Sequence, residues 1–120
     1  MKMKYMLVPV LLVAGAFLPS KSNVRAQESP RRIEIVAKQF AFEPSEITVK
    51  KGQPVVLVIK SADVAHGLRF RELNLNVKVD KGGTAELPLT PDKTGDFVGH
   101  CSVFCGSGHG EMALTMHVVN

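Results

Sequence analysis

Polar and apolar residues alternate over short segments of this chain. Residues 46–50 alternate cleanly, with Ile47 and Val49 on one face, and residues 33–37 alternate in part. Because successive side chains of a strand point to opposite faces of a sheet, both segments are predicted to be strands. The continuous apolar run at residues 55–59 has the length of a strand and predicts one that is buried inside a sheet.

Similar segments continue to the end of the chain. They are residues 66–70, 77–79, 84–89, 96–100 and 113–119, with turn sequences at 51–54, 81–83 and 91–95. The short segment 66–70 is expected to be an edge strand. Short strands separated by frequent turns predict an all-β Greek-key sandwich or barrel. An immunoglobulin-like module is the alternative, but it often carries a core Trp and widely spaced cysteines, whereas this chain has no Trp and its two cysteines are four residues apart.

The N-terminal residues differ from the rest. Lys2 and Lys4 precede an apolar run of 13 residues, 6–18. A basic start followed by such a run predicts a secretory signal peptide at residues 1–26, with cleavage after Ala26. The run is shorter than the roughly 20 residues needed to span a bilayer, so a retained membrane anchor is the less favoured alternative. We expect an exported protein that is periplasmic or attached to the outer face of the cytoplasmic membrane.

Removal of residues 1–26 would change the charge of the chain. Residues 27–31 are predicted to be a polar linker and residues 32–120 a single domain. Four of the 15 basic residues lie before residue 27, which leaves 11 to balance 11 acidic residues. The basic balance of the whole chain therefore does not predict a nucleic-acid partner.

The candidate chemistry lies between the last two predicted strands. Cys101, Cys105, His109 and Met112 fall within twelve residues. Thiolate, imidazole and thioether together favour copper, since thioether is a poor ligand for zinc. A mononuclear blue copper site would use one thiolate, two imidazoles and a weak axial Met. The second imidazole would come from His66, which follows the predicted central strand.

These residues carry a specific resemblance. Asp63-Val64-Ala65-His66 and the spacing Cys101-x3-Cys105-x3-His109-x2-Met112 resemble the CuA domain of cytochrome c oxidase subunit II, and nitrous oxide reductase has a similar domain. The similarity extends over roughly residues 33–119. It implies a cupredoxin fold and a centre of two copper ions that transfers electrons.

The resemblance also implies a role for each site residue. Cys101 and Cys105 would bridge two coppers, and His66 and His109 would each terminate one. Met112 would be a weak ligand, and the backbone carbonyl of Val103 would complete the set. The family usually has Glu where Val103 stands, and that Glu helps to bind magnesium, so no magnesium site of that kind is expected here. Phe104 is expected to belong to an apolar shell around the metals.

Three alternatives to the CuA interpretation remain. Two cysteines in an exported chain ordinarily form a disulfide, although the flanking His109 and Met112 favour a metal. The other two are a mononuclear blue copper carrier, in which Cys101 is a spare thiol, and a periplasmic copper storage or delivery protein.

No nucleophile and base pair indicates an enzyme. We therefore expect no catalysis by the chain alone, although it could be an accessory or subunit II-like component of an oxidase. The expected partners are a c-type cytochrome or other redox protein as donor and a terminal oxidase or reductase as acceptor.

Overall fold

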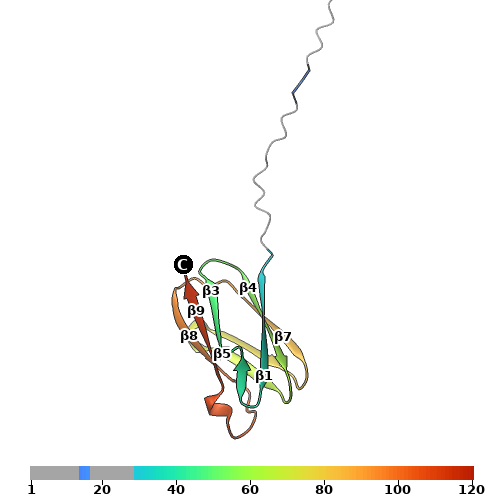
Figure 1. Cartoon of the computed structure of the whole chain (residues 1–120), viewed down its shortest axis with the longest axis vertical. Coiled ribbons are helices and arrows are strands. Elements are labelled where there is room, and N and C mark those ends of the chain that lie inside the picture. Colours follow the sequence, from blue (N-terminus) through green and yellow to red (C-terminus); the bar gives the residue numbers. More distant parts are fainter. Residues whose placement is uncertain (1–13, 17–28) are drawn as a thin grey trace, which may run out of the picture.

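Strands make up most of the folded part of the molecule (Figure 1). The computed structural model describes residues 14–16 and 29–120. The predicted cleavage point after Ala26, most of the predicted signal peptide and the first two residues of the predicted linker lie outside the described residues. No helix in the part that is described combines the length and the apolar character needed to cross a membrane.

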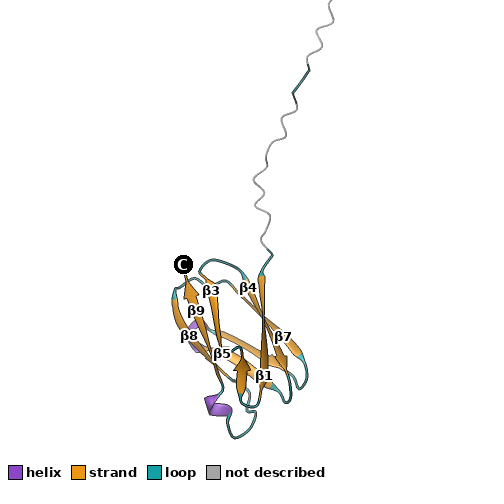
Figure 2. Cartoon of the chain, viewed as in Figure 1, coloured by secondary structure: helices purple, strands orange, loops and turns teal. Residues whose placement is uncertain are grey.

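Nine strands and two short 3-10 helices are present in the described residues (Figure 2). The strands are β1 (Arg31–Lys38), β2 (Ala41–Glu43), β3 (Glu46–Lys50), β4 (Val55–Ser61), β5 (His66–Phe70), β6 (Leu75–Val79), β7 (Thr84–Leu89), β8 (Gly95–His100) and β9 (Ala113–Val119). The 3-10 helices are η1 (Arg71–Leu73) and η2 (His109–Glu111). Each strand predicted from the sequence is present. Only β2 was missed, because three residues are too few to show a period.

The strands form two sheets that pack as a sandwich. One sheet has the order β2-β1-β4-β7 and the other β3-β9-β8-β5-β6. β1 pairs in parallel with β4, and β3 with β9. The prediction of a buried central strand is confirmed by β4, which lies between β1 and β7. The prediction that residues 66–70 form an edge strand is wrong, because β5 pairs with β6 on one side and β8 on the other. Strand length does not reveal how many neighbours a strand has.

The core lies between the two sheets. Alternate residues of the strands point into it, as the period of two requires. Ile35, Leu57 and Ile59 of the first sheet and Leu68 and Leu114 of the second are fully buried. Each such side chain stabilises the fold by about 1.5–3 kcal/mol.

One end of this sandwich collects the segments that carry the candidate chemistry. β1 and β4 run in parallel, so both end there, and β5 and β9 begin there. The loop between β8 and β9, which contains η2, projects from this end, whereas the C-terminus lies at the opposite end (Figure 1). The sheets therefore act as a rigid support for a cluster of loops.

Candidate metal centre

A loop between the last two strands presents the two cysteines. Its base is closed where the backbone N–H of Cys101 donates to the carbonyl of Met112 at 3.1 Å. Cys101, Cys105 and Met112 are 5%, 6% and 0% exposed. The loop thus turns its sulfur atoms inward, against the core.

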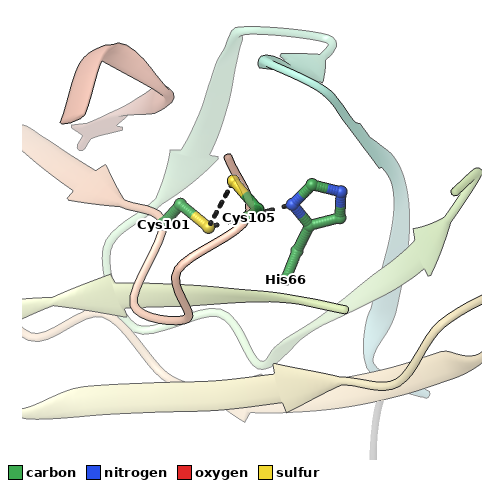
Figure 3. Close-up of side chains that lie close together, drawn as sticks. All are labelled: His66, Cys101 and Cys105. Carbon is green, nitrogen blue, oxygen red and sulfur yellow. Dashed lines mark hydrogen bonds between the residues drawn. The ribbon is translucent and has the colours of Figure 1, made fainter. Parts of the chain in front are cut away.

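The two thiols face each other (Figure 3). Their Sγ atoms are 3.8 Å apart, whereas a disulfide bond is about 2.05 Å long, so both cysteines are free thiols. His66 at the start of β5 is fully buried, and its Nδ1 lies 3.9 Å from Cys101 Sγ. Donor atoms of His66, Cys101 and Cys105 all lie within 4.8 Å of one another.

A second set of donors surrounds Cys105. Its Sγ lies 3.7 Å from His109 Nδ1 and 3.9 Å from Met112 Sδ. On the other side, the carbonyl oxygen of Val103 lies 3.2 Å from Cys101 Sγ. The structure therefore brings together all six residues that the sequence proposed, with an imidazole beside each thiol.

The spacing of these donors fits soft metal ions. Two ligands held at about 2.0–2.3 Å on one tetrahedral metal are about 3.3–3.8 Å apart. The thiol–imidazole and thiol–thiol distances of 3.7–3.9 Å lie close to that range. A donor set of two thiols, two imidazoles and a thioether is a copper set rather than a magnesium or calcium set.

A carboxylate contacts His66 on the side of the ring opposite Cys101. Asp63 Oδ1 lies 2.6 Å from His66 Nε2 and also accepts the backbone N–H of Val64 at 2.7 Å. Asp63 Oδ2 accepts the backbone N–H of Gln39 at 2.8 Å. The Gln39 side chain in turn donates to the carbonyl of Cys105 at 2.8 Å. Asp63 and Gln39 thus connect His66 to the cysteine loop.

Sequence reasoning assigned no role to Asp63 or Gln39. The signal for Asp63 was present, since it lies three residues before His66 in the segment that carried the resemblance. Gln39 gave no such signal, because it is 66 residues from Cys105 and only the packing of the sheets brings them together.

The local environment shifts two pKa values in opposite directions. Burial, aided by the neighbouring Cys101, raises the pKa of Cys105 to about 11. Burial also acts to raise the pKa of Asp63, but hydrogen bonds from Gln39, His66 and Val64 outweigh it and lower the pKa of that carboxyl. At neutral pH the metal-free site therefore holds a protonated Cys105 beside an ionised Asp63, and a metal must displace the thiol proton to bind.

Phe40 packs against two glycines of the cysteine loop. A Cβ atom on Gly108 would lie 2.5 Å from Phe40 Cγ, and one on Gly106 would lie 2.8 Å from its Cε1. Gly108 thus allows close approach to the ring, and Gly106 also has a φ of +134°, which favours glycine. The prediction for Phe104 is wrong, since this side chain is 79% exposed. Its ring centroid lies 5.6 Å from that of His109, and the side chain points toward solvent.

The sandwich and the cluster of candidate metal ligands at one end of it indicate the class of this protein. A family model described as the cupredoxin-like domain matches residues 9–113, and the chain belongs to that family. Within it, the chain is similar to cytochrome c oxidase subunit 2 of Thermus thermophilus, at 30% identity over 83% of this chain and 74% of that relative.

Solved structures agree on the fold. A chain of a heme-copper terminal oxidase dimer is 28% identical, with a TM-score of 0.66 over 76% of this chain and 66% of that one. The periplasmic domain of subunit II of the cytochrome oxidase of Bradyrhizobium japonicum has a TM-score of 0.67 at 21% identity, over 74% of this chain and 83% of that one. The predicted cupredoxin fold and the resemblance to subunit II are confirmed.

Proposed function

We propose that this chain binds two copper ions in a centre of CuA type and carries single electrons between redox partners. One observation carries the proposal. The two thiols lie 3.8 Å apart, and each has its own imidazole, His66 beside Cys101 at 3.9 Å and His109 beside Cys105 at 3.7 Å. A mononuclear site needs only one thiolate, whereas this doubled arrangement suits two metals that share both sulfurs.

Six residues would hold the metals. Cys101 and Cys105 would bridge them, His66 and His109 would terminate them, and Val103 (through its carbonyl) and Met112 would be the weak ligands. When bound, a binuclear copper centre supplies a one-electron couple whose unpaired electron is shared by both metals and both thiolates.

The chain's own residues prepare this site. Asp63 fixes the orientation of His66 and favours the tautomer with its proton on Nε2, which leaves Nδ1 free as a ligand atom. The hydrogen bond from Gln39 holds the cysteine loop in place. Burial of Cys101, Cys105 and Met112 excludes water from the sulfur atoms. A site held in this way moves little on a change of charge, which favours fast electron transfer.

The sequence and the relatives together suggest where the protein works. We infer that residues 1–26 direct export, that cleavage follows Ala26, and that a linker at 27–31 leads to a domain at 32–120 in the periplasm. Similarity to subunit II of terminal oxidases supports an oxidase or reductase as electron acceptor and a c-type cytochrome as donor.

The test is copper stoichiometry combined with electron paramagnetic resonance of the reconstituted protein. We expect two coppers per chain and hyperfine coupling shared equally by both nuclei. The variant Cys101→Ser should lose that signal, and Met116→Leu, a change at a fully buried methionine in β9 outside the site, should keep it. One copper per chain with a localised signal that survives Cys101→Ser would contradict the proposal and indicate a mononuclear carrier. Copper that passes readily to an acceptor without reversible redox cycling would indicate a delivery protein.

A further inference from the structure

A hollow of about 170 Å³ opens beside the candidate metal centre. It is lined by Arg69, Arg71, His100, Cys101, Ser102 and His109. These residues come from β5, η1, the end of β8 and the cysteine loop, so the hollow exists only in the folded chain. A cavity needs about 10–15 Å³ to hold one water molecule, so this hollow has room for a small oxyanion.

The arginines of the described residues differ in whether their side chains have a hydrogen-bond or ion-pair partner. Arg31 donates to the carbonyl of Thr48 at 3.1 Å, and Arg32 pairs with Glu86. Arg69 and Arg71 have no hydrogen bond or ion pair from their side chains to any residue in the described part of the chain. Both of them line the hollow. Among the arginines that the structure describes, the two without partners are thus the two that share one cavity.

Strand pairing also brings two of the basic side chains that line the hollow next to each other. Arg69 and His100 are directly opposite each other where β5 pairs with β8, and both are exposed on the outer face of the sheet. Basic groups at directly opposed positions gain nothing from each other and repel when both are charged. An anion between them would remove that penalty.

The two imidazoles of the candidate metal centre also differ in whether their second ring nitrogen has a hydrogen-bond partner. His66 has Asp63 as the acceptor on its Nε2 at 2.6 Å. His109 faces Cys105 with its Nδ1, and its Nε2 has no hydrogen-bond partner among the residues described. A histidine that binds a metal ordinarily donates its other N–H to a carboxylate, a carbonyl or water. Since His109 also lines the hollow, an anion there would complete its hydrogen bonding.

We propose that this hollow is an oxyanion-binding site that takes a carboxylate or phosphate-type group. Arg69 and Arg71 supply the planar forks of donors that match such groups, and His100 and His109 supply ring N–H groups. Ser102 lines the hollow but supplies no free donor, because its hydroxyl already donates to Asn76 Oδ1 at 2.8 Å. The site goes beyond electron transfer, since it gives the face next to the metal centre a preference for acidic ligands.

The test is an NMR titration of the full chain, metal-free and with its thiols reduced, with inorganic phosphate in one arm and sodium acetate in the other. We expect saturable shift changes at residues 69, 71, 100 and 109, with a dissociation constant in the range of about 1 mM or below. The metal-free chain makes the result independent of the proposed copper centre. Tighter binding of acetate would point to a carboxylate carried by a partner, and tighter binding of phosphate to a free oxyanion.

Variants decide whether the hollow is responsible. Arg69→Gln and Arg71→Gln should each weaken the binding of phosphate or acetate about tenfold, the loss expected for one charge-assisted hydrogen bond. The matched control is Arg32→Gln, which removes an arginine from the other sheet and should leave the affinity unchanged. Shifts that grow linearly without saturation, or that are the same in all three variants, would overturn the proposal.

Discussion

Asp63 Oδ1 lies 2.6 Å from His66 Nε2, while the opposite nitrogen of the same ring, Nδ1, faces Cys101 Sγ at 3.9 Å. The imidazole is therefore held between a carboxylate and a thiol. Because His66 is fully buried, its ring nitrogens have protein partners rather than bulk solvent. The orientation of this candidate ligand depends on a residue that does not itself face the sulfur atoms.

The Asp63→Asn variant should bind copper about 10–100-fold more weakly, as is typical when a carboxylate behind a metal-bound histidine is removed. The amide keeps the size of the side chain but removes the charge. Competition with a copper(I) chelator measures the affinity. The melting temperature of the metal-free protein is measured in parallel, so that a general loss of stability can be recognised. Glu43→Gln, at an exposed carboxylate paired with Lys38, is the control, and equal affinities in the two variants would contradict this role.

Met112→Leu should separate the packing of Met112 from its role as a ligand. The side chain is fully buried and its sulfur lies 3.9 Å from Cys105 Sγ. Leu has nearly the same volume, so the free energy of unfolding of the metal-free protein should change by less than about 1.5 kcal/mol. The copper-loaded protein, in contrast, should change its reduction potential and its visible spectrum. Denaturant titration and voltammetry give the two readouts. An unchanged potential and spectrum would mean that Met112 only fills space.

Gly108→Ala should destabilise the cysteine loop. The new methyl group would lie 2.5 Å from Phe40 Cγ and 3.0 Å from its Cβ, near the root of the side chain, where rotation gives little relief. We expect the free energy of unfolding to fall by about 1–3 kcal/mol, the usual cost of overpacking, as measured by urea denaturation. Gly110→Ala is the matched control, since nothing lies within 4 Å of its added Cβ. The double variant with Phe40→Ala should show less than the summed loss, and strict additivity would mean that the ring is not the obstacle.

His117 should make stability depend on pH. Hydrogen bonds to Asp96, at 2.6 Å, and then to Glu46, at 3.3 Å, raise the pKa of His117 above 6.5. A raised pKa means that the folded state holds this proton more tightly than the unfolded chain does. The stabilisation is therefore fully present below the ordinary histidine pKa and is lost as the pH rises through the folded value.

Melting temperatures of the native chain and of His117→Gln test this dependence. The difference between them should be largest near about pH 5–6 and should shrink at higher pH. A difference that grows as the pH rises would show that the sign is wrong.

The fold was accessible from the sequence because its strands obey a simple rule. Ile47 and Val49 were placed on one face of a strand, and both are buried. The alternation of side chains does not show which strands pair with each other. It gave no means of telling that β5 is internal, and it missed Ala41–Glu43, whose pairing with β1 shows only in three dimensions.

The candidate site also has residues that the sequence predicted correctly and one that it did not. The spacing of Cys101, Cys105, His109 and Met112 was readable because one loop carries them all. Phe104 was expected in the apolar shell but is exposed, since composition does not tell which way a loop turns a side chain.

The sequence by itself determined the all-β class and the set of donors, because both depend on residue type and short-range order. Only the tertiary structure decided that Gln39 holds the loop of Cys105 and that Arg69 lies opposite His100. These relationships depend on which strands pair and on how far each connection reaches. That choice is made by packing energy summed over the whole sandwich, and no short segment contains it.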